Sequence, residues 1–162
     1  MKKVEELYKE NYSKMFHLAM KMTHDENVAN DVVQEVFIYF FEKSQNEHRV
    51  THPQSWLVRA TTNKCIDYLK YKEKFTQLNE ANQQTTDGNS YEINQSKQLL
   101  KQAISRLKPL EMKIIFLYSE DYSYKEIAQI AKINFSSVGK TLSRTLQKLK
   151  VILKKMNYEM YE

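Results

Sequence analysis

The sequence predicts an all-α protein built from two small helical domains joined by a flexible linker. The chain of 162 residues has only 2 glycines and 2 prolines, so it contains few of the residues that usually mark turns. Apolar residues recur at three- and four-residue steps through most of the chain, which is the period of an amphipathic helix. Residues 76–97 interrupt this pattern. They are rich in Asn, Gln and Thr and too polar to build a core, which predicts the linker.

The first domain, residues 1–75, is expected to begin with two long helices. The first covers about 4–22, and Asp25 can cap a second helix over about 26–43. That second helix buries a stripe of apolar residues, Ala29, Val32, Val33, Val36, Phe37 and Phe40. Its other side holds Asp31, Gln34 and Glu35, which are neighbours on a helix surface. On the residues alone, this acidic patch is either an ordinary solvated face or a docking surface for a basic protein, and the solvated face is the simpler interpretation.

A polar loop over residues 44–53 leads to a third helix, expected from Gln54 to about Phe75. Arg and Lys residues lie along this helix among aromatic ones. Basic groups interleaved with rings suit single-stranded nucleic acid, because bases stack on the rings. Core aromatics with solvated lysines are an equal alternative on the residues alone. His48 and His52 in the loop do not predict a metal site, because no cysteine lies near them in sequence and the segment does not look helical.

The second domain, residues 98–157, is expected to contain four helices. The first covers about 98–107, and Pro109 suits the first turn of the next. Ser123 and Glu126 form a capping box that starts a third, short helix. In this short helix, three residues are expected to face inward: Ile127, Ala128 and Ala131. After a break at 132–134, a final helix carries one apolar stripe, Val138, Leu142, Leu146, Leu149 and Leu153.

The outward face of the final helix is basic and rich in hydroxyl groups. It carries Ser136, Ser137, Lys140, Thr141, Arg144 and Lys148, and the preceding turn adds Lys132. Residues 132–155 contain seven Lys or Arg residues and no Asp or Glu. A helix with an apolar back and a basic front, set behind a shorter helix, is what a helix-turn-helix presents to the major groove. An ordinary helical hairpin with a solvated basic face is the alternative.

Charge and cysteine content narrow the class of protein. The net charge is +5, and the basic residues gather in two blocks, 48–74 and 97–155, on either side of an acidic spacer. This distribution indicates two contacts with DNA. The single cysteine, Cys65, excludes an intrachain disulfide and a Cys-rich zinc site and favours a reducing cytosol. The longest apolar run, Val36 to Phe41, is too short to span a bilayer.

Together, these motifs resemble bacterial RNA polymerase sigma factors of the sigma-70 family, in the extracytoplasmic-function (ECF) group. The segment Asp31-Val-Val-Gln-Glu-Val-Phe37 is similar to the most recognisable part of region 2. Trp56-Leu57, Asn63 and Asp67 resemble the promoter-melting helix that follows it. The residues that resemble region 4 are Leu107-Lys-Pro-Leu110, Tyr124-Lys-Glu-Ile-Ala128, Val138 and Arg144. The resemblance implies region 2 in residues 1–75, a linker in 76–97 and region 4 in 98–157.

The resemblance also implies a role for each polar surface. Asp31, Gln34 and Glu35 would dock on the coiled coil of the largest subunit of core RNA polymerase. The displaced strand of the minus-ten element would meet Arg49, Arg59, Asn63, Lys64, Lys70, Lys72 and Lys74. The minus-thirty-five element, as duplex, would meet Lys132, Ser136, Ser137, Lys140, Thr141, Arg144 and Lys148. ECF factors are commonly held by an anti-sigma protein, and no cofactor or metal is expected.

The sequence departs from the family pattern at two positions. Lys132 stands where the turn usually has glycine, and Gly139 stands where a basic residue usually follows the valine. We therefore expect a cytoplasmic transcription initiation factor that binds core polymerase, selects promoters and assists melting. The alternative is a free-standing helix-turn-helix regulator, which leaves the acidic patch and the melting helix unexplained. An enzyme is disfavoured, because the sequence lacks a Ser/His/Asp or Cys/His signature and a phosphate-binding glycine loop.

Overall fold

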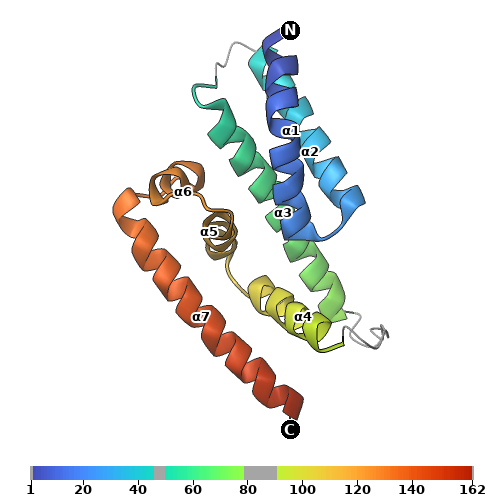
Figure 1. Ribbon diagram of the computed structural model, residues 1–162, viewed down its shortest axis with the longest axis vertical. Helices are drawn as coiled ribbons and strands as arrows, with labels where there is room; N and C mark the ends of the chain where they lie inside the picture. The colour runs from blue at the N-terminus through green and yellow to red at the C-terminus, as the bar shows by residue number, and fades with distance from the viewer. Residues whose placement is uncertain (1, 46–49, 79–90, 162) are drawn as a thin grey trace.

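The computed structural model of the chain describes residues 2–45, 50–78 and 91–161. Every regular element within these residues is an α-helix, which confirms the predicted fold class. The first half contains α1 (Lys2–Thr23), α2 (Glu26–Gln45) and α3 (Pro53–Leu78). The second half contains α4 (Tyr91–Ser105), α5 (Pro109–Ser119), α6 (Tyr124–Ala131) and α7 (Phe135–Tyr161), as Figure 1 shows.

Helices α1, α2 and α3 pack against one another as a three-helix bundle (Figure 1). Met15, Met22, Val33 and Leu57 are among the side chains that this bundle buries completely. The six apolar residues predicted to face inward on α2 are all buried. Removing one such side chain from water stabilises the fold by about 1.5–3 kcal/mol, so these rows hold the bundle together.

The turn between α1 and α2 has the cap that the sequence predicted. His24 adopts the left-handed conformation, with φ 54°. Asp25 Oδ1 then accepts hydrogen bonds from the backbone N–H groups of Asn27 and Val28, at 3.0 and 3.2 Å. These N–H groups have no partner within the helix, so the carboxylate stabilises the start of α2.

The starts of α5 and α6 also agree with the sequence. Pro109 occupies the first turn of α5, and Glu111 Oε1 accepts a hydrogen bond from the backbone N–H of Lys108 at 2.8 Å. At α6, Ser123 Oγ accepts from the N–H of Glu126, and Glu126 Oε1 accepts from the N–H of Ser123, both at 3.1 Å. This reciprocal pair is the predicted capping box, and it fixes the beginning of the helix-turn-helix.

Helix α4 corrects the expected bounds of the linker. It begins at Tyr91, whereas the linker was expected to extend to residue 97, and α3 continues to Leu78 rather than ending near residue 75. Glu, Gln and Lys are good helix formers, so a polar composition does not by itself exclude a helix. Residues 79–90 lie outside the described part of the chain.

The two halves of the molecule meet along α3. Helices α4, α5 and α6 each contact α3, and α5 and α6 lie between α3 and α7 (Figure 1). No pattern in the sequence predicted this arrangement. It places the helix-turn-helix and its supporting helix beside the helix predicted to bind single-stranded DNA.

Candidate nucleic-acid and protein-partner interfaces

The acidic face of α2 is exposed along its length. Asp31, Gln34 and Glu35 all lie on the surface, on the side opposite the buried stripe. Ile38 continues the same row and is 58% exposed, which is unusual for an isoleucine. Sequence reasoning missed Ile38, although its spacing from Gln34 and Glu35 could have placed it on this face.

Glu35 and Lys64, which the sequence assigned to different partners, pair with each other. Lys64 Nζ on α3 lies 2.8 Å from Glu35 Oε2 on α2, and both side chains are largely exposed. An ion pair in solvent contributes only about 0.2–1 kcal/mol, so either partner can be drawn away by a binding surface. Asp67 and Tyr68 lie beside this pair and line the same shallow groove between α2 and α3.

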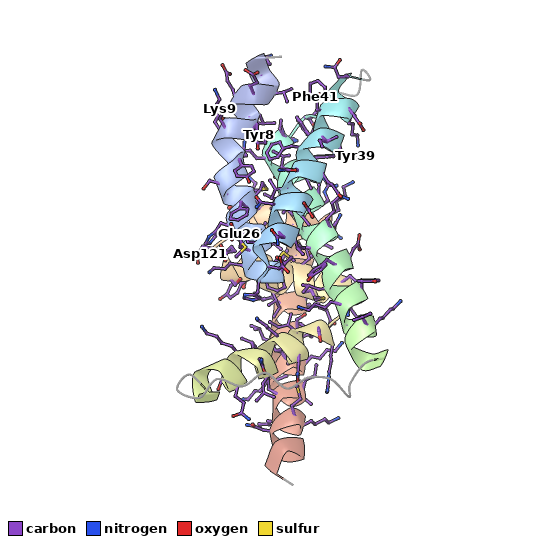
Figure 2. The ribbon with its side chains drawn as sticks, turned by 90° about the vertical axis from the view of Figure 1, so that its right-hand side faces the viewer. Tyr8, Lys9, Glu26, Tyr39, Phe41 and Asp121 are labelled. Atoms are coloured by element: carbon purple, nitrogen blue, oxygen red, sulfur yellow. The ribbon has the colours of Figure 1, made fainter. Side chains whose placement is uncertain are left out.

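Trp56, at the start of α3, organises an aromatic cluster. Its ring stacks on Tyr39, with centroids 5.8 Å apart, and meets Phe40 edge-on at 5.3 Å. Lys43 Nζ lies 5.8 Å from the centroid of the Trp56 ring. Tyr39 and Phe41 project from the end of α2 farthest from α4 (Figure 2).

A hollow of about 280 Å³ opens beside this aromatic cluster. Thr51, His52, Trp56 and Arg59 line it from the first half of the chain, and Gln129 of α6 lines it from the second half. Arg59 is half-buried, whereas Asn63, one turn further along α3, is exposed. Arg49, also predicted to contact DNA, and His48 lie outside the described residues.

The three lysines predicted on the C-terminal part of α3 differ in their surroundings. Lys70 Nζ donates hydrogen bonds to the carbonyl oxygens of Ser105, at 2.9 Å, and Leu107, at 2.5 Å, and also lies 3.4 Å from Glu73 Oε2. Lys72 Nζ lies 6.0 Å from the centroid of the Tyr68 ring. Lys74 is exposed. Lys70 is therefore engaged by the other half of the chain rather than displayed to solvent.

The helix-turn-helix separates its predicted DNA contacts into two groups. Lys132, Ser136, Lys140 and Arg144 are exposed. Ser137, Thr141 and Lys148 are half-buried. Lys148 Nζ lies 2.9 Å from Glu111 Oε1, and this pairing, despite partial burial, holds the pKa of Glu111 below its ordinary value.

Ser143 and Gln147 share the exposed face of α7 with Lys140 and Arg144, and sequence reasoning missed both. They follow Lys140 at three and seven residues, so the helical period could have identified them. Gln147 is the more informative omission, because an amide can form paired hydrogen bonds with adenine in the major groove. Phe135, at the start of α7, is also 63% exposed.

The prediction of the apolar stripe of α7 is wrong at one position. Val138, Leu142 and Leu149 are buried as predicted, but Leu146 is 45% exposed and Thr145 is buried in its place. Repeated four-residue steps drift around a helix of 3.6 residues per turn, so Leu146 lies beyond the core. Thr145 satisfies its hydroxyl by donating to the carbonyl oxygen of Thr141 at 2.7 Å. On α6 a similar exchange occurs, since Ile130 is buried while Ala131 is only half-buried.

Both departures from the family pattern have a structural counterpart. Lys132 ends α6 with φ 56° and ψ 47°, the left-handed conformation that glycine adopts without steric cost. At Gly139 an added Cβ would meet Tyr124 Cε2 at 3.6 Å, which is ordinary van der Waals contact. The turn therefore favours glycine at position 132, whereas position 139 has room for a side chain.

Among the described residues, no group of His, Cys, Asp and Glu is arranged to hold a metal ion. In the same part of the chain, no helix is both long and apolar enough to cross a membrane.

Comparison with known proteins places both halves of the chain in one family. Residues 7–75 match Sigma-70 region 2, and residues 97–149 match Sigma-70, region 4. The chain is 26% identical to RNA polymerase sigma factor YlaC of Bacillus subtilis (strain 168), over 96% of this chain and 95% of that protein. It is 25% identical to the ECF RNA polymerase sigma factor SigM of the same organism, over 92% and 94%.

The arrangement of helices is similar to that of a solved structure. It is the sigma factor RpoE in complex with the anti-sigma factor NepR from Bartonella quintana, with a TM-score of 0.58 and 17% identity. The similarity covers 95% of this chain and 98% of that one. At this level of identity, the likeness concerns the fold.

Proposed function

The chain belongs to the sigma-70 family of RNA polymerase sigma factors. From this premise we propose which of its surfaces binds core polymerase and which bind promoter DNA. Similarity over nearly the full length of two sigma factors supports an ECF-type factor that binds core RNA polymerase, directs it to promoters and assists melting. Sigma factors are transcription initiation factors rather than enzymes, and this chain carries out no chemistry of its own. In this proposal, region 2 comprises α1, α2 and α3, and region 4 comprises α4, α5, α6 and α7.

The exposed face of α2 is the polymerase-docking surface. Asp31, Gln34 and Glu35 would meet the basic coiled coil of the largest subunit, where opposite charges favour encounter and fix the register. Ile38, beside them, would supply the desolvated apolar contact that usually dominates binding energy at the centre of an interface. Docking would draw Glu35 away from Lys64 at little cost, because that pair is exposed.

Helix α3 and the loop before it bind the displaced strand of the minus-ten element. Arg59 and Asn63 lie one turn apart on one side of α3, near the aromatic cluster around Trp56, and Lys64 lies about 100° further round the helix, beside α2. Cations follow the backbone of a single strand, while rings and amides meet its unstacked bases. Lys72 and Lys74 extend this basic path toward the C-terminal end of α3. Lys70 could contact the strand only after it releases its hydrogen bond to the carbonyl oxygen of Ser105 on α4.

Helix α7 reads the minus-thirty-five element as duplex. The exposed residues Ser136, Lys140 and Arg144 would enter the major groove, as the second helix of this motif does. Lys132 in the turn would contact phosphate. Ser143 and Gln147 join this set because they share the exposed face.

The opposite charges of the exposed faces favour a factor that binds both polymerase and DNA. An exposed acidic face on α2 coexists with exposed basic faces on α3 and α7. An acidic face is a poor surface for DNA, whereas a factor that links a basic surface of polymerase to DNA needs faces of both signs. This distinguishes the proposal from a free-standing regulator.

Further partners follow from the family. We place the chain in the cytoplasm, with polymerase and the chromosome, and expect an anti-sigma protein to hold it, as NepR is found with RpoE. No cofactor or metal takes part in this function.

The test is run-off transcription with purified core polymerase, with and without this chain, on genomic promoter fragments. A sigma factor yields specific transcripts only when chain and core are both present. A gel shift on the same fragments tests the alternative, because a free-standing regulator binds its duplex site without polymerase.

A further inference from the structure

Phe135, the first residue of α7, exposes an aromatic ring beside the residues that we propose to enter the major groove. Its side chain is 63% exposed. A single exposed apolar residue is common on protein surfaces and needs no explanation by itself. Phe135 differs by its position, because the N-terminal residues of a recognition helix are those that contact base edges.

Phe135 begins a row of residues on α7 that continues into the proposed DNA-binding face. Gly139, Ser143 and Gln147 follow it at steps of four residues, and such steps form one of the ridges on a helix surface. Ser143 and Gln147 are exposed, as Phe135 is. Each step turns the row by about 40° around the helix axis, so the ridge runs toward the face that carries Lys140.

The gap that Gly139 leaves in this ridge is bordered by the ring of Tyr124. A Cβ added at Gly139 would lie 3.6 Å from Tyr124 Cε2, so this ring of α6 lies against α7 at that point. Figure 1 shows α6 beside the first turns of α7. The Tyr124 side chain is 41% exposed, so part of its ring is open to a ligand. Phe135 and Gly139 are one turn apart, and the two rings therefore lie on the same side of α7.

The surface formed by Phe135, Gly139 and Tyr124 restricts which bases can be recognised there. A phenylalanine ring and a glycine offer no side-chain donor or acceptor, so neither can distinguish bases by hydrogen bonds. The apolar group in the major groove is the C5-methyl of thymine, and phenylalanine is among the side chains that contact it. Lys132 and Lys140, close to Phe135 in sequence, are exposed and fit the phosphates of the same duplex.

We propose that this apolar surface contacts the C5-methyl of a thymine in the minus-thirty-five element, and that Phe135 is thereby a specificity-determining residue. This rests on the proposed function of α7. A basic residue usually occupies the position of Gly139 in the family, and a Lys or Arg side chain can pair with phosphate or with guanine. Glycine between two rings removes that contact and leaves an apolar one, so the chain selects an A·T pair where the start of α7 meets the bases.

The experiment asks whether the methyl group of thymine is recognised through Phe135. A minus-thirty-five element is first selected from a random-sequence duplex library with the full chain bound to core polymerase. Each thymine of the element is then replaced in turn by deoxyuridine, which lacks the C5-methyl but keeps the same hydrogen-bonding groups. Fluorescence anisotropy measures the affinity of the holoenzyme for each duplex.

The variants separate the ring of Phe135 from other features of α7. Phe135→Ala removes the ring, and Phe135→Leu keeps an apolar side chain. Val151→Ala is the matched control, because Val151 is 49% exposed on the same helix, about 24 Å from Phe135 along the axis. Circular dichroism confirms that each variant is folded.

We expect deoxyuridine at one or more positions to weaken binding of the wild-type holoenzyme by about fourfold, the ratio that corresponds to one methyl group removed from water. Phe135→Ala should bind the thymine and deoxyuridine duplexes equally, Phe135→Leu should keep part of the preference, and Val151→Ala should keep all of it. A selected element without thymine would overturn the proposal. Equal binding of all duplexes by wild type would do the same, as would an unchanged preference in Phe135→Ala.

Arg144→Ala tests the proposed function of α7 separately. It should lower the affinity for both duplexes and leave their ratio unchanged, because Arg144 is exposed on the basic face and not beside the two rings. Undiminished affinity in Arg144→Ala would count against the proposed function. A normal effect of Arg144→Ala without any thymine preference would count only against the role of Phe135.

Discussion

Replacing Lys132 by glycine should stabilise the protein, although it removes a charged side chain and adds flexibility. The left-handed conformation at Lys132 costs a residue with a side chain about 1–2 kcal/mol, which glycine does not incur. Glycine offsets about 0.5–1 kcal/mol of this gain, because it loses more freedom on folding. The backbone N–H of residue 132 can still donate to the carbonyl oxygen of Ala128, so the cap is kept. The net stabilisation of the free energy of unfolding is about 0.5–1 kcal/mol, or about 2–8 °C in Tm for a small domain.

The assay is urea unfolding followed by circular dichroism, with Lys125→Gly as the matched control. Lys125 is exposed in the first turn of α6, and glycine in a helix costs up to about 1 kcal/mol relative to a good helix former. The same chemical change should therefore have opposite signs at the two positions. Affinity for minus-thirty-five duplex should fall in Lys132→Gly, because a proposed phosphate contact is lost. A midpoint equal to or below that of wild type would refute the account of the turn.

Reversing Asp31 and Glu35 to Lys should weaken binding to core polymerase by about 2 kcal/mol or more without unfolding the chain, because like charges would meet at the docking surface, and a titration with core polymerase measures this. Asn63→Ala should impair promoter opening and Arg144→Ala recruitment, so a pre-melted bubble template should rescue only the former in run-off assays, since it removes an unstacking cost of a few kcal/mol. A five-base-pair insertion between the promoter elements should nearly abolish transcription, because polymerase would hold each domain in a fixed place. Acidification from about pH 7.5 to about pH 5.5 should weaken the packing of the α1–α2 turn beside α4. Burial, and then Lys101, Lys72 and Lys97, lower the pKa of His24 below 6.5, so the form in which this turn is open takes up the proton first, and His24→Asn should reduce the pH dependence in scattering measurements.

Local patterns predicted most of the fold. The caps at Asp25 and Ser123 and the buried row of α2 follow from the backbone requirements of one helix at a time, and all of them are present. The error at Leu146 arose from the same method, because a row chosen by four-residue steps drifts away from the buried side. The early start of α4 was missed because a polar composition was taken as the mark of a linker, although Glu, Gln and Lys are good helix formers.

The candidate site was harder to predict because it depends on residues far apart in the sequence. Charge and spacing predicted that Lys64 and Lys70 lie on a basic helix. They did not predict that Lys64 pairs with Glu35 on α2, or that Lys70 donates to a carbonyl oxygen at the end of α4. Those contacts arise only when separate helices pack. A lysine that follows a DNA strand and a lysine that holds two domains together have the same pattern in the sequence.

Because Cys65 is buried, modification of its thiol can be used to follow unfolding of the chain. Its thiol is fully buried in the first bundle, and burial raises its pKa to about 12. Thiol-modifying reagents attack the thiolate, so at neutral pH the native molecule is protected from them. Since the sequence contains no other cysteine, each modification records one opening of the bundle formed by α1, α2 and α3. The rate of labelling of the unaltered protein would therefore measure how a bound partner changes the local stability of region 2, without any introduced probe.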